Sequence, residues 1–168
     1  EGLYNTAVVI SEKGRMLGKY RKTHIPQDEN YFEQEYFRPG DTGFRVFPTS
    51  FGKVGVLICY DQWYPEAARI NALLGADIVF YPTAIGNVQG IEQTEGNWKK
   101  AWESVMRGHA IANGMVVAAV NRVGKEEKMR FWGGSVVFDA FGRTVAQGDS
   151  KQGVVIANID LEHGRQVK

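Results

Sequence analysis

The sequence is poor in the residues that crosslink chains or bind metals, with one cysteine and three histidines among 168 residues. A single cysteine cannot form an internal disulfide, so a reducing compartment, the cytoplasm, is expected. The histidines, His24, His109 and His163, have no second ligand at helical or turn spacing. This spacing argues against a zinc site, and no metal is expected.

Long apolar runs and strong net charge are also missing. No stretch of about 18 consecutive apolar residues occurs, which argues against a membrane-spanning helix. The formal net charge is +1, which favours neither nucleic acid nor an anionic membrane as a partner. The expected partner is therefore a small molecule or another protein.

The first part of the chain predicts a hairpin followed by a long loop. Two β-prone runs flank a glycine-containing turn over residues 6–20, the pattern of a β-hairpin. Residues 23–43 are polar and aromatic, contain two prolines and end in a turn-forming "PGD". We expect a long loop with some helix there, and long loops inside compact domains usually carry function.

A βαβ unit is predicted next. Residues 53–59 and 76–82 are apolar runs typical of strands covered on both faces. Between them, Pro65 fits the first turn of a helix and Gly75 its end. Apolar residues recur at helical spacing along that helix: Ala67, Ala68, Ile70, Leu73 and Leu74. This order predicts parallel strands with a crossover helix.

The rest of the chain predicts a longer helix and several strands. Asn97 can cap a helix over residues 98–113, which ends at Gly114. Its expected inner face contains Ala101, Trp102, Val105, Met106 and Ile111. Strands follow at 115–121, twice within 133–148 around a turn at Phe141 and Gly142, and at 153–160. The fold class is therefore α/β with a mixed sheet, two sheets packed face to face being one arrangement, and residues 1–168 form one domain.

Cys59 lies where the first buried strand passes into the helix. That junction opens at the carboxyl edge of the sheet, where ligands bind in α/β proteins, and the positive helix end would favour a thiolate. The alternative is a small apolar residue of the core. A nucleophilic thiol needs a base. We expect His109 to be a hydrogen-bonded interior residue and His24 to shape its loop.

Two motifs carry a resemblance to a known family. They are "GKYRKTHIPQDENYFEQEYFRPGD" and "GVLICYDQWYPEAAR", supported further along by "YPTAIG", "RGHAIANGMVVAAVNRVG", "GGSVVFDAFGRTVAQG" and "ANIDLE". In this order they resemble the nitrilase, or carbon–nitrogen hydrolase, superfamily. The resemblance implies an α-β-β-α sandwich that dimerises or assembles further. It also implies a Glu-Lys-Cys site with no metal or organic cofactor.

Matched residue by residue, the resemblance makes Cys59 the nucleophile, Lys22 the catalytic lysine and Glu33 an additional glutamate beside them. The backbone N–H of Tyr60 matches a donor to the oxyanion. These residue types suit the chemistry, because a neighbouring ammonium stabilises a thiolate and a developing oxyanion. A carboxylate can move the thiol proton to departing ammonia.

One element of the family pattern has no match. The general base in relatives is a glutamate several dozen residues before the lysine, whereas 21 residues precede Lys22 here. Neither Glu1 nor Glu12 lies in a matching motif, so the base is assigned to no residue. The chain is therefore expected to be the central and later part of a longer domain, without its N-terminal part and its C-terminal tail.

The residues after the cysteine favour one substrate class. They resemble the branch that hydrolyses N-carbamoylputrescine to putrescine, ammonia and carbon dioxide. Tyr60, Asp61 and Trp63 stand where relatives acting on N-carbamoyl-D-amino acids carry arginines, and they suit an alkyl ammonium better than a carboxylate. Trp63 and Tyr64 could equally be packing residues. A related amidase for another amide, or a catalytically silent module that oligomerises, are the alternatives.

Overall fold

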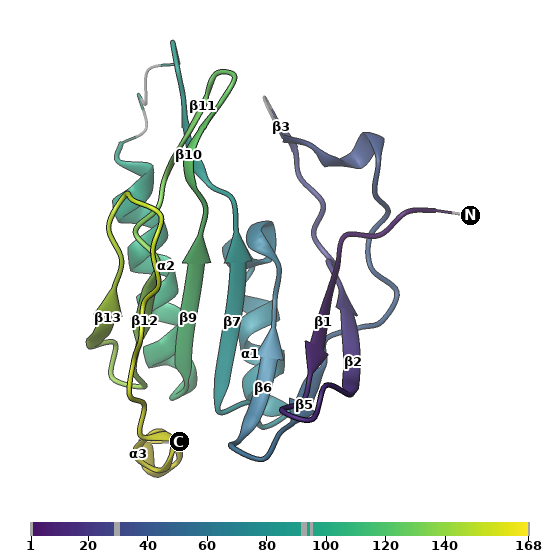
Figure 1. Ribbon diagram of the computed structural model, residues 1–168, viewed down its shortest axis with the longest axis vertical. Coiled ribbons are helices and arrows are strands. Elements are labelled where there is room, and N and C mark those ends of the chain that lie inside the picture. Colours follow the sequence, from purple (N-terminus) through teal and green to yellow (C-terminus); the bar gives the residue numbers. More distant parts are fainter. Residues whose placement is uncertain (1, 29–30, 92–93, 95, 168) are drawn as a thin grey trace.

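A six-stranded mixed sheet is the centre of the computed structural model, which describes residues 2–28, 31–91, 94 and 96–167 (Figure 1). Across the sheet the strands run in the order β13 (Thr144–Gln147), β12 (Val136–Phe138), β9 (Val116–Asn121), β7 (Ile78–Thr83), β6 (Lys53–Val56) and β5 (Val46–Pro48). Strands β6, β7 and β9 are parallel to one another. Each outer strand is antiparallel to its inner neighbour: β5 to β6, β12 to β9 and β13 to β12. The predicted βαβ unit and mixed sheet are confirmed.

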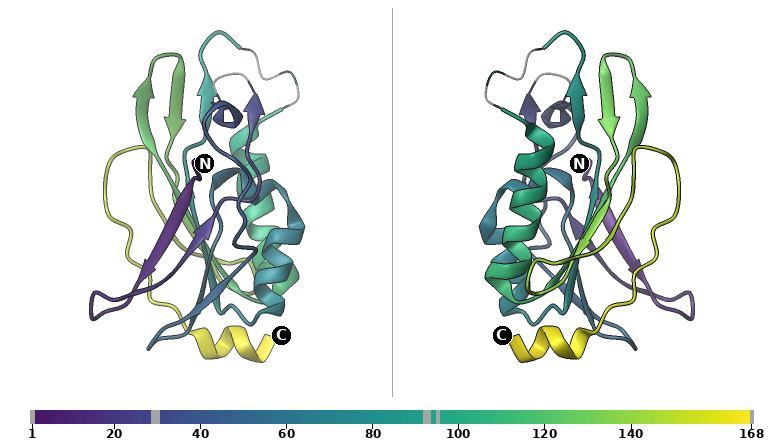
Figure 2. Two further views of the ribbon diagram at one scale, coloured as in Figure 1. Left: turned by 90° about the vertical axis from the view of Figure 1, so that its right-hand side faces the viewer. Right: turned by 90° about the vertical axis from the view of Figure 1, so that its left-hand side faces the viewer.

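Two helices cover one face of this sheet, α1 (Pro65–Leu73) and α2 (Trp98–Asn113) (Figure 2). The main core lies between the helices and the sheet, where Trp102 and Met106 are fully buried. The predicted ends of α2 are confirmed. The Asn97 side chain accepts a hydrogen bond from the Lys100 N–H at 2.9 Å, and Gly114 has a left-handed φ of 56°.

Part of the predicted inner face of α2 is wrong, and α1 buries only some of its regularly spaced apolar residues. In α1 the fully buried stripe is Ala67, Ala68 and Asn71, and Leu73 on the other side is 77% exposed. In α2, Ala101 and Ile111 are exposed. A helix packed on a sheet buries only one stripe, so apolar residues at neighbouring helical positions can still face outward.

The opposite face of the sheet carries the C-terminal segment. A small apolar cluster there contains Ile78, Val116 and Ala118, with Ile159 and Leu161 packed against it. The segment crosses this face and ends in α3 (Leu161–Val167) (Figure 2). The strand predicted at 153–160 is wrong. Among the described residues, the backbone of this segment pairs with no other strand. A strand needs such a neighbour to satisfy its N–H and C=O groups.

Smaller sheets surround the large one. The predicted hairpin is confirmed as β1 (Thr6–Ile10) and β2 (Met16–Arg21), which are antiparallel. The long loop contains the expected helix as the short 3-10 helix η1 (Glu33–Glu35). It also contains two short antiparallel strands that were not predicted, β3 (Gln27–Asp28) and β4 (Tyr31–Phe32).

A further, three-stranded sheet was not predicted. It consists of β8 (Gly86–Val88), β10 (Val123–Glu126) and β11 (Met129–Trp132), and β10 and β11 extend beyond the carboxyl end of β9 (Figure 1). None of the helices in the described residues has the length and apolar content needed to span a bilayer.

Candidate active site

Cys59 begins the 3-10 helix η2 (Cys59–Trp63), just after the carboxyl end of β6 and before α1. Its φ angle is +43°, a left-handed conformation that a residue with a Cβ rarely adopts. Such a conformation costs on the order of 1–3 kcal/mol and is concentrated at functional sites. The sharp turn thus holds the thiol at the edge of the sheet, as expected from the sequence.

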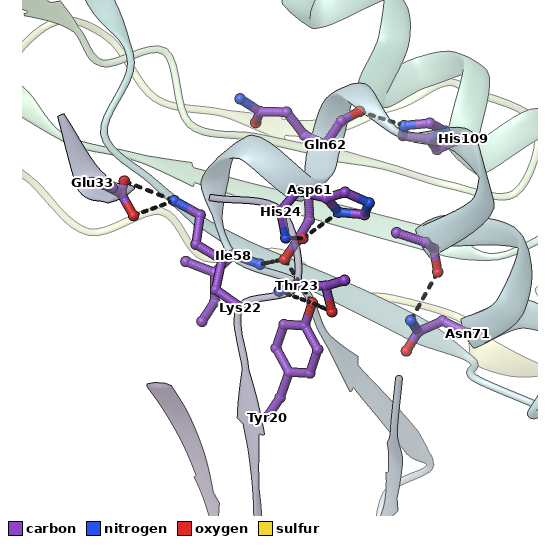
Figure 3. Close-up of polar contacts among 11 residues, drawn as sticks. Tyr20, Lys22, Thr23, His24, Glu33, Ile58, Asp61, Gln62, Asn71 and His109 are labelled. Atoms are coloured by element: carbon purple, nitrogen blue, oxygen red, sulfur yellow. Dashed lines mark hydrogen bonds and ion pairs between the residues drawn. The ribbon is translucent and has the colours of Figure 1, made fainter. Parts of the chain in front are cut away.

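Lys22 and Glu33 form an ion pair close to this turn (Figure 3). The Lys22 Nζ lies 2.7 Å from both carboxylate oxygens of Glu33, and the lysine side chain has no exposed surface. Asn5 donates to Glu33 Oε2 at 3.3 Å, which joins the start of the chain to the pair. A buried ammonium is costly unless paired, and this carboxylate supplies the partner.

The thiol of Cys59 experiences opposing influences. Burial is the largest and raises its pKa, while the Lys22 ammonium and a hydrogen bond from the Ala84 backbone lower it. The negative charges of Glu33 and Asp61 raise it again by smaller amounts. The pKa of the thiol therefore remains above its ordinary value. Among the groups that lower it, the Lys22 ammonium has the largest effect, so Lys22 is the main positive charge that favours the thiolate.

Asp61 is fully buried and does not line the cavity beside Cys59. Its Oδ2 accepts hydrogen bonds from the Ile58 N–H and the Tyr20 hydroxyl, both at 2.8 Å. Its Oδ1 accepts from the His24 N–H at 3.0 Å and lies 2.7 Å from the His24 Nδ1 (Figure 3). Both oxygens are thus occupied by protein groups. Asp61 was expected to bind substrate, and the structure does not place it in the cavity.

The two inner histidines have the structural roles that were predicted. The His24 ring stacks on Tyr64 with centroids 3.7 Å apart, which places Tyr64 in packing. His109 is buried, and its Nε2 lies 2.8 Å from the Gln62 carbonyl oxygen (Figure 3). Burial lowers the pKa of His109, which suits a neutral interior ring.

A cavity of about 670 Å³ opens beside the thiol, within the usual range for small-molecule sites. Cys59, Tyr60 and Trp63 line it, so two of the three residues expected to bind substrate lie in its wall. Among the described residues the rest of the lining is Pro26, Asp28, Tyr31, Gln62, Ala84, Ile85, Gly86, Val88, Ile91, Thr94, Trp98 and Trp132. This part of the wall contains no lysine, arginine or histidine.

Several lining residues were missed at the sequence level. Trp98 starts α2 and Trp132 ends β11, and neither position has a periodic pattern that would indicate a cavity. Asp28 lies in the long loop, whose polar and aromatic composition was the one available signal. Among the described residues, no group of three or more histidine, cysteine, aspartate or glutamate side chains is placed to hold a metal ion.

The chain is similar to proteins of one family. Residues 1–168 match the family described as carbon–nitrogen hydrolase. N-carbamoylputrescine amidase from Arabidopsis thaliana is 46% identical over 171 residues, a match covering 95% of this chain and 56% of that protein. A citrullinase from Francisella tularensis is 42% identical, over 97% of this chain and 58% of that protein. The chain thus spans little more than half the length of these curated relatives.

Solved structures agree with the fold. A carbon–nitrogen hydrolase from Helicobacter pylori G27 superposes with a TM-score of 0.94 at 46% identity, covering 98% of this chain and 59% of that one. An amidase from Nesterenkonia sp. AN1 superposes at 0.80 with 27% identity, covering 96% and 57%. One mutant of that amidase carries the acetamide moiety of fluoroacetamide on its active site cysteine, and the amidase is of the nitrilase superfamily. The predicted nitrilase-like α/β fold is confirmed.

Proposed function

The chain belongs to the carbon–nitrogen hydrolase family, and from this premise we propose that the complete protein hydrolyses the terminal ureido group of N-carbamoylputrescine. The products are putrescine, ammonia and carbon dioxide. The observation that carries the proposal is the position of Cys59. Its thiol lies in the wall of a small-molecule cavity, beside the buried Lys22 and its partner Glu33, on a strained turn at the carboxyl edge of the sheet.

In the first step the Cys59 thiolate attacks the ureido carbon. The oxyanion that develops on the ureido oxygen is stabilised by a hydrogen bond from the Tyr60 N–H and by the positive charge of the nearby buried Lys22 ammonium. The bond to the terminal nitrogen breaks, and ammonia leaves with the proton that the thiol gave up. The enzyme then carries the substrate's alkylcarbamoyl group as a thioester on Cys59.

In the second step water attacks the thioester carbon and the thiolate leaves. The released carbamic acid loses carbon dioxide without further help and becomes putrescine, so one water molecule is consumed overall. A general base must take a proton in each half of the reaction. We assign that base to no residue of this chain, and Glu33 acts by holding the Lys22 ammonium in place.

The charge of the cavity supports a cationic substrate. Arginine commonly captures a carboxylate through two hydrogen bonds, and a lysine serves as a point charge. The described wall offers neither to a substrate carboxylate, whereas its aromatic rings suit an alkyl chain that ends in an ammonium. The 46% identity with a relative named for N-carbamoylputrescine agrees with this choice.

Ammonia release by the complete gene product tests the proposal. The substrates are N-carbamoylputrescine, citrulline and a simple aliphatic amide such as butyramide. We expect release from the first to exceed the others by at least about tenfold in kcat/KM, and Cys59→Ala to abolish it while the circular dichroism spectrum is unchanged. A preference for citrulline or for the amide would mean that the proposed substrate, N-carbamoylputrescine, is wrong. Release from none by folded protein would support a silent module instead.

Assembly into a homo-oligomer, as in the family that the chain resembles, is also part of the proposal. Sedimentation of the complete gene product tests it, and a concentration-independent monomer would remove it. A cytoplasmic location remains a prediction from the single cysteine.

A further inference from the structure

One charged side chain stands in the described part of the wall around Cys59, that of Asp28. Asp28 is the second residue of β3, on the loop that also carries Glu33. The other described lining residues are apolar, aromatic or uncharged polar. A carboxylate in a wall without lysine, arginine or histidine gives this part of the cavity a negative charge, which attracts a cation and repels a carboxylate.

Tyr31 lines the same cavity as Asp28 and the reacting thiol. Burial raises the pKa of the Tyr31 phenol to about 12, and the negative charge of Cys59 raises it further. A hydrogen bond with the Gly86 backbone lowers it, and the negative charges of Asp28 and Glu33 raise it by smaller amounts. All three negatively charged groups therefore lie close enough to act on one phenol. Burial and Tyr64 are the main causes that raise the pKa of Tyr60, the residue that follows the nucleophile, and Asp28 adds the smallest contribution. Asp28 and Cys59 thus face the same small space from two different elements.

Aromatic rings complete the surroundings of this space. Trp63 and Trp98 meet edge to face with centroids 5.8 Å apart, and both line the cavity together with Tyr60. Ring faces attract alkylammonium groups by cation–π interaction, and their carbon surfaces pack against methylene chains. A carboxylate beside several rings is therefore matched to a primary ammonium at the end of a short alkyl chain.

We propose that Asp28 binds the ammonium end of the substrate and so determines the specificity of the cavity for a cationic ureido compound. The inference rests on the proposed function and assigns its substrate selection to a named carboxylate. The ureido group would lie at Cys59 while the chain extends along the rings toward Asp28. This places the role expected of Asp61, capture of the cationic end, on a residue of the preceding loop.

The test compares two substrates that differ only in charge, N-carbamoylputrescine and N-pentylurea, with the complete gene product. In N-pentylurea a methyl group replaces the ammonium. We expect Asp28→Asn to lower kcat/KM for N-carbamoylputrescine by about ten- to hundredfold, because the amide keeps an acceptor oxygen but loses the charge that strengthens a hydrogen bond to an ammonium. The loss should fall on KM, because the contact exists before and during the reaction. Turnover of N-pentylurea should be unchanged.

Glu35→Gln is the matched control. It removes one negative charge from an exposed side chain of the same loop, outside the described cavity wall, and should leave both substrates unaffected. Asp28→Glu keeps the charge and should retain the preference for N-carbamoylputrescine over N-pentylurea. If Asp28→Asn folds poorly, Asp28→Ser replaces it. Salt dependence provides a test on the wild type. Its KM for N-carbamoylputrescine should rise with ionic strength, whereas its KM for N-pentylurea should not.

Equal losses on both substrates in Asp28→Asn, or no loss on either, would overturn the assignment of Asp28 and leave the proposed function intact. If the wild type releases ammonia from neither ureido compound, the proposed function fails. The Asp28 subsite is then tested by protection, in which putrescine slows alkylation of Cys59 by iodoacetamide. Protection of the wild type but not of Asp28→Asn supports the subsite, and equal or absent protection in both proteins rejects it.

Discussion

Asp61 holds His24 by two contacts from one oxygen, since Oδ1 accepts from the His24 backbone N–H at 3.0 Å and lies 2.7 Å from the ring Nδ1. The other oxygen binds the Ile58 N–H, one residue before the nucleophile. Because Lys22 directly follows β2 and lies two residues before His24, one carboxylate connects the segment that carries the lysine with the turn that carries the thiol. We therefore regard Asp61 as a positioning residue.

Replacing Asp61 by asparagine should destabilise the protein. An amide fills the same volume, but its NH₂ group would face one of the donors that the carboxylate now accepts from. One buried donor would be left without an acceptor, at a cost of about 1–3 kcal/mol in the free energy of unfolding. Urea denaturation of wild type and Asp61→Asn measures the difference. Asp41→Asn, which removes an exposed ion pair with Arg21, should have a much smaller effect. Equal effects would contradict the role of Asp61.

Lys22 should control the reactivity of Cys59. The Lys22 ammonium lowers the thiol pKa more than the Glu33 carboxylate raises it. Glu33→Gln should therefore move the midpoint of the pH dependence of iodoacetamide alkylation downward. The double change Lys22→Met with Glu33→Gln should move it upward, so that alkylation at neutral pH slows. Lys19→Met, at an exposed position of β2, is the control. A downward shift in the double variant would exclude Lys22 as the group that stabilises the thiolate.

The sequence predicts the elements that depend on local patterns. The hairpin, the βαβ unit around Pro65 and the helix capped by Asn97 each follow from turn residues, caps and periodicity within a short window. The segment 153–160 has the apolar composition of a strand, but strand formation depends on an adjacent strand, and composition does not supply one. Exposure of Leu73 and Ile111 likewise depends on how the helices sit on the sheet.

The candidate site is predictable only in part for the same reason. Cys59 and Lys22 could be singled out by motif, and the ion pair with Glu33 agrees with that choice. The direction of the Asp61 side chain depends on Tyr20, which lies 41 positions earlier in the sequence. Trp132 reaches the cavity through the β8–β11 pairing, and no short-range pattern predicts that register.

The strained backbone at Cys59 predicts an unusual order of stability between two variants. At ordinary positions glycine is less stable than alanine because it loses more conformational entropy on folding, by about 0.5–1 kcal/mol in a helix or strand. At a φ of +43° alanine keeps the steric penalty of a Cβ, whereas glycine does not. Cys59→Gly should therefore be as stable as Cys59→Ala or more stable, by up to about 1 kcal/mol.

Thermal or urea unfolding of the two variants measures this order, and Ala101 gives the comparison. Residue 101 lies on the exposed side of α2, where Ala101→Gly should cost about 1 kcal/mol. If Cys59→Gly is less stable than Cys59→Ala by a similar amount, the turn at residue 59 is not strained.

His109 should make the protein less stable in mild acid. Its pKa is lowered in the folded state by burial, while in the unfolded chain it titrates near 6.5. Below about pH 6.5 the unfolded chain binds a proton that the folded protein does not. The free energy of unfolding therefore falls as the pH falls, by at most about 1.4 kcal/mol per unit from this residue, until the folded pKa is reached.

Urea denaturation at a series of pH values between 5 and 8 measures that slope. His109→Gln keeps a donor for the Gln62 carbonyl oxygen and removes the titration, so its slope in this window should be smaller than that of the wild type. His163→Gln is the control, because the side chain of His163 lies at the surface near Arg143. An unchanged slope in His109→Gln would mean that other groups produce the acid sensitivity. A smaller slope in His109→Gln, with no change in His163→Gln, would assign the acid sensitivity to the buried His109 ring beside the Gln62 carbonyl oxygen.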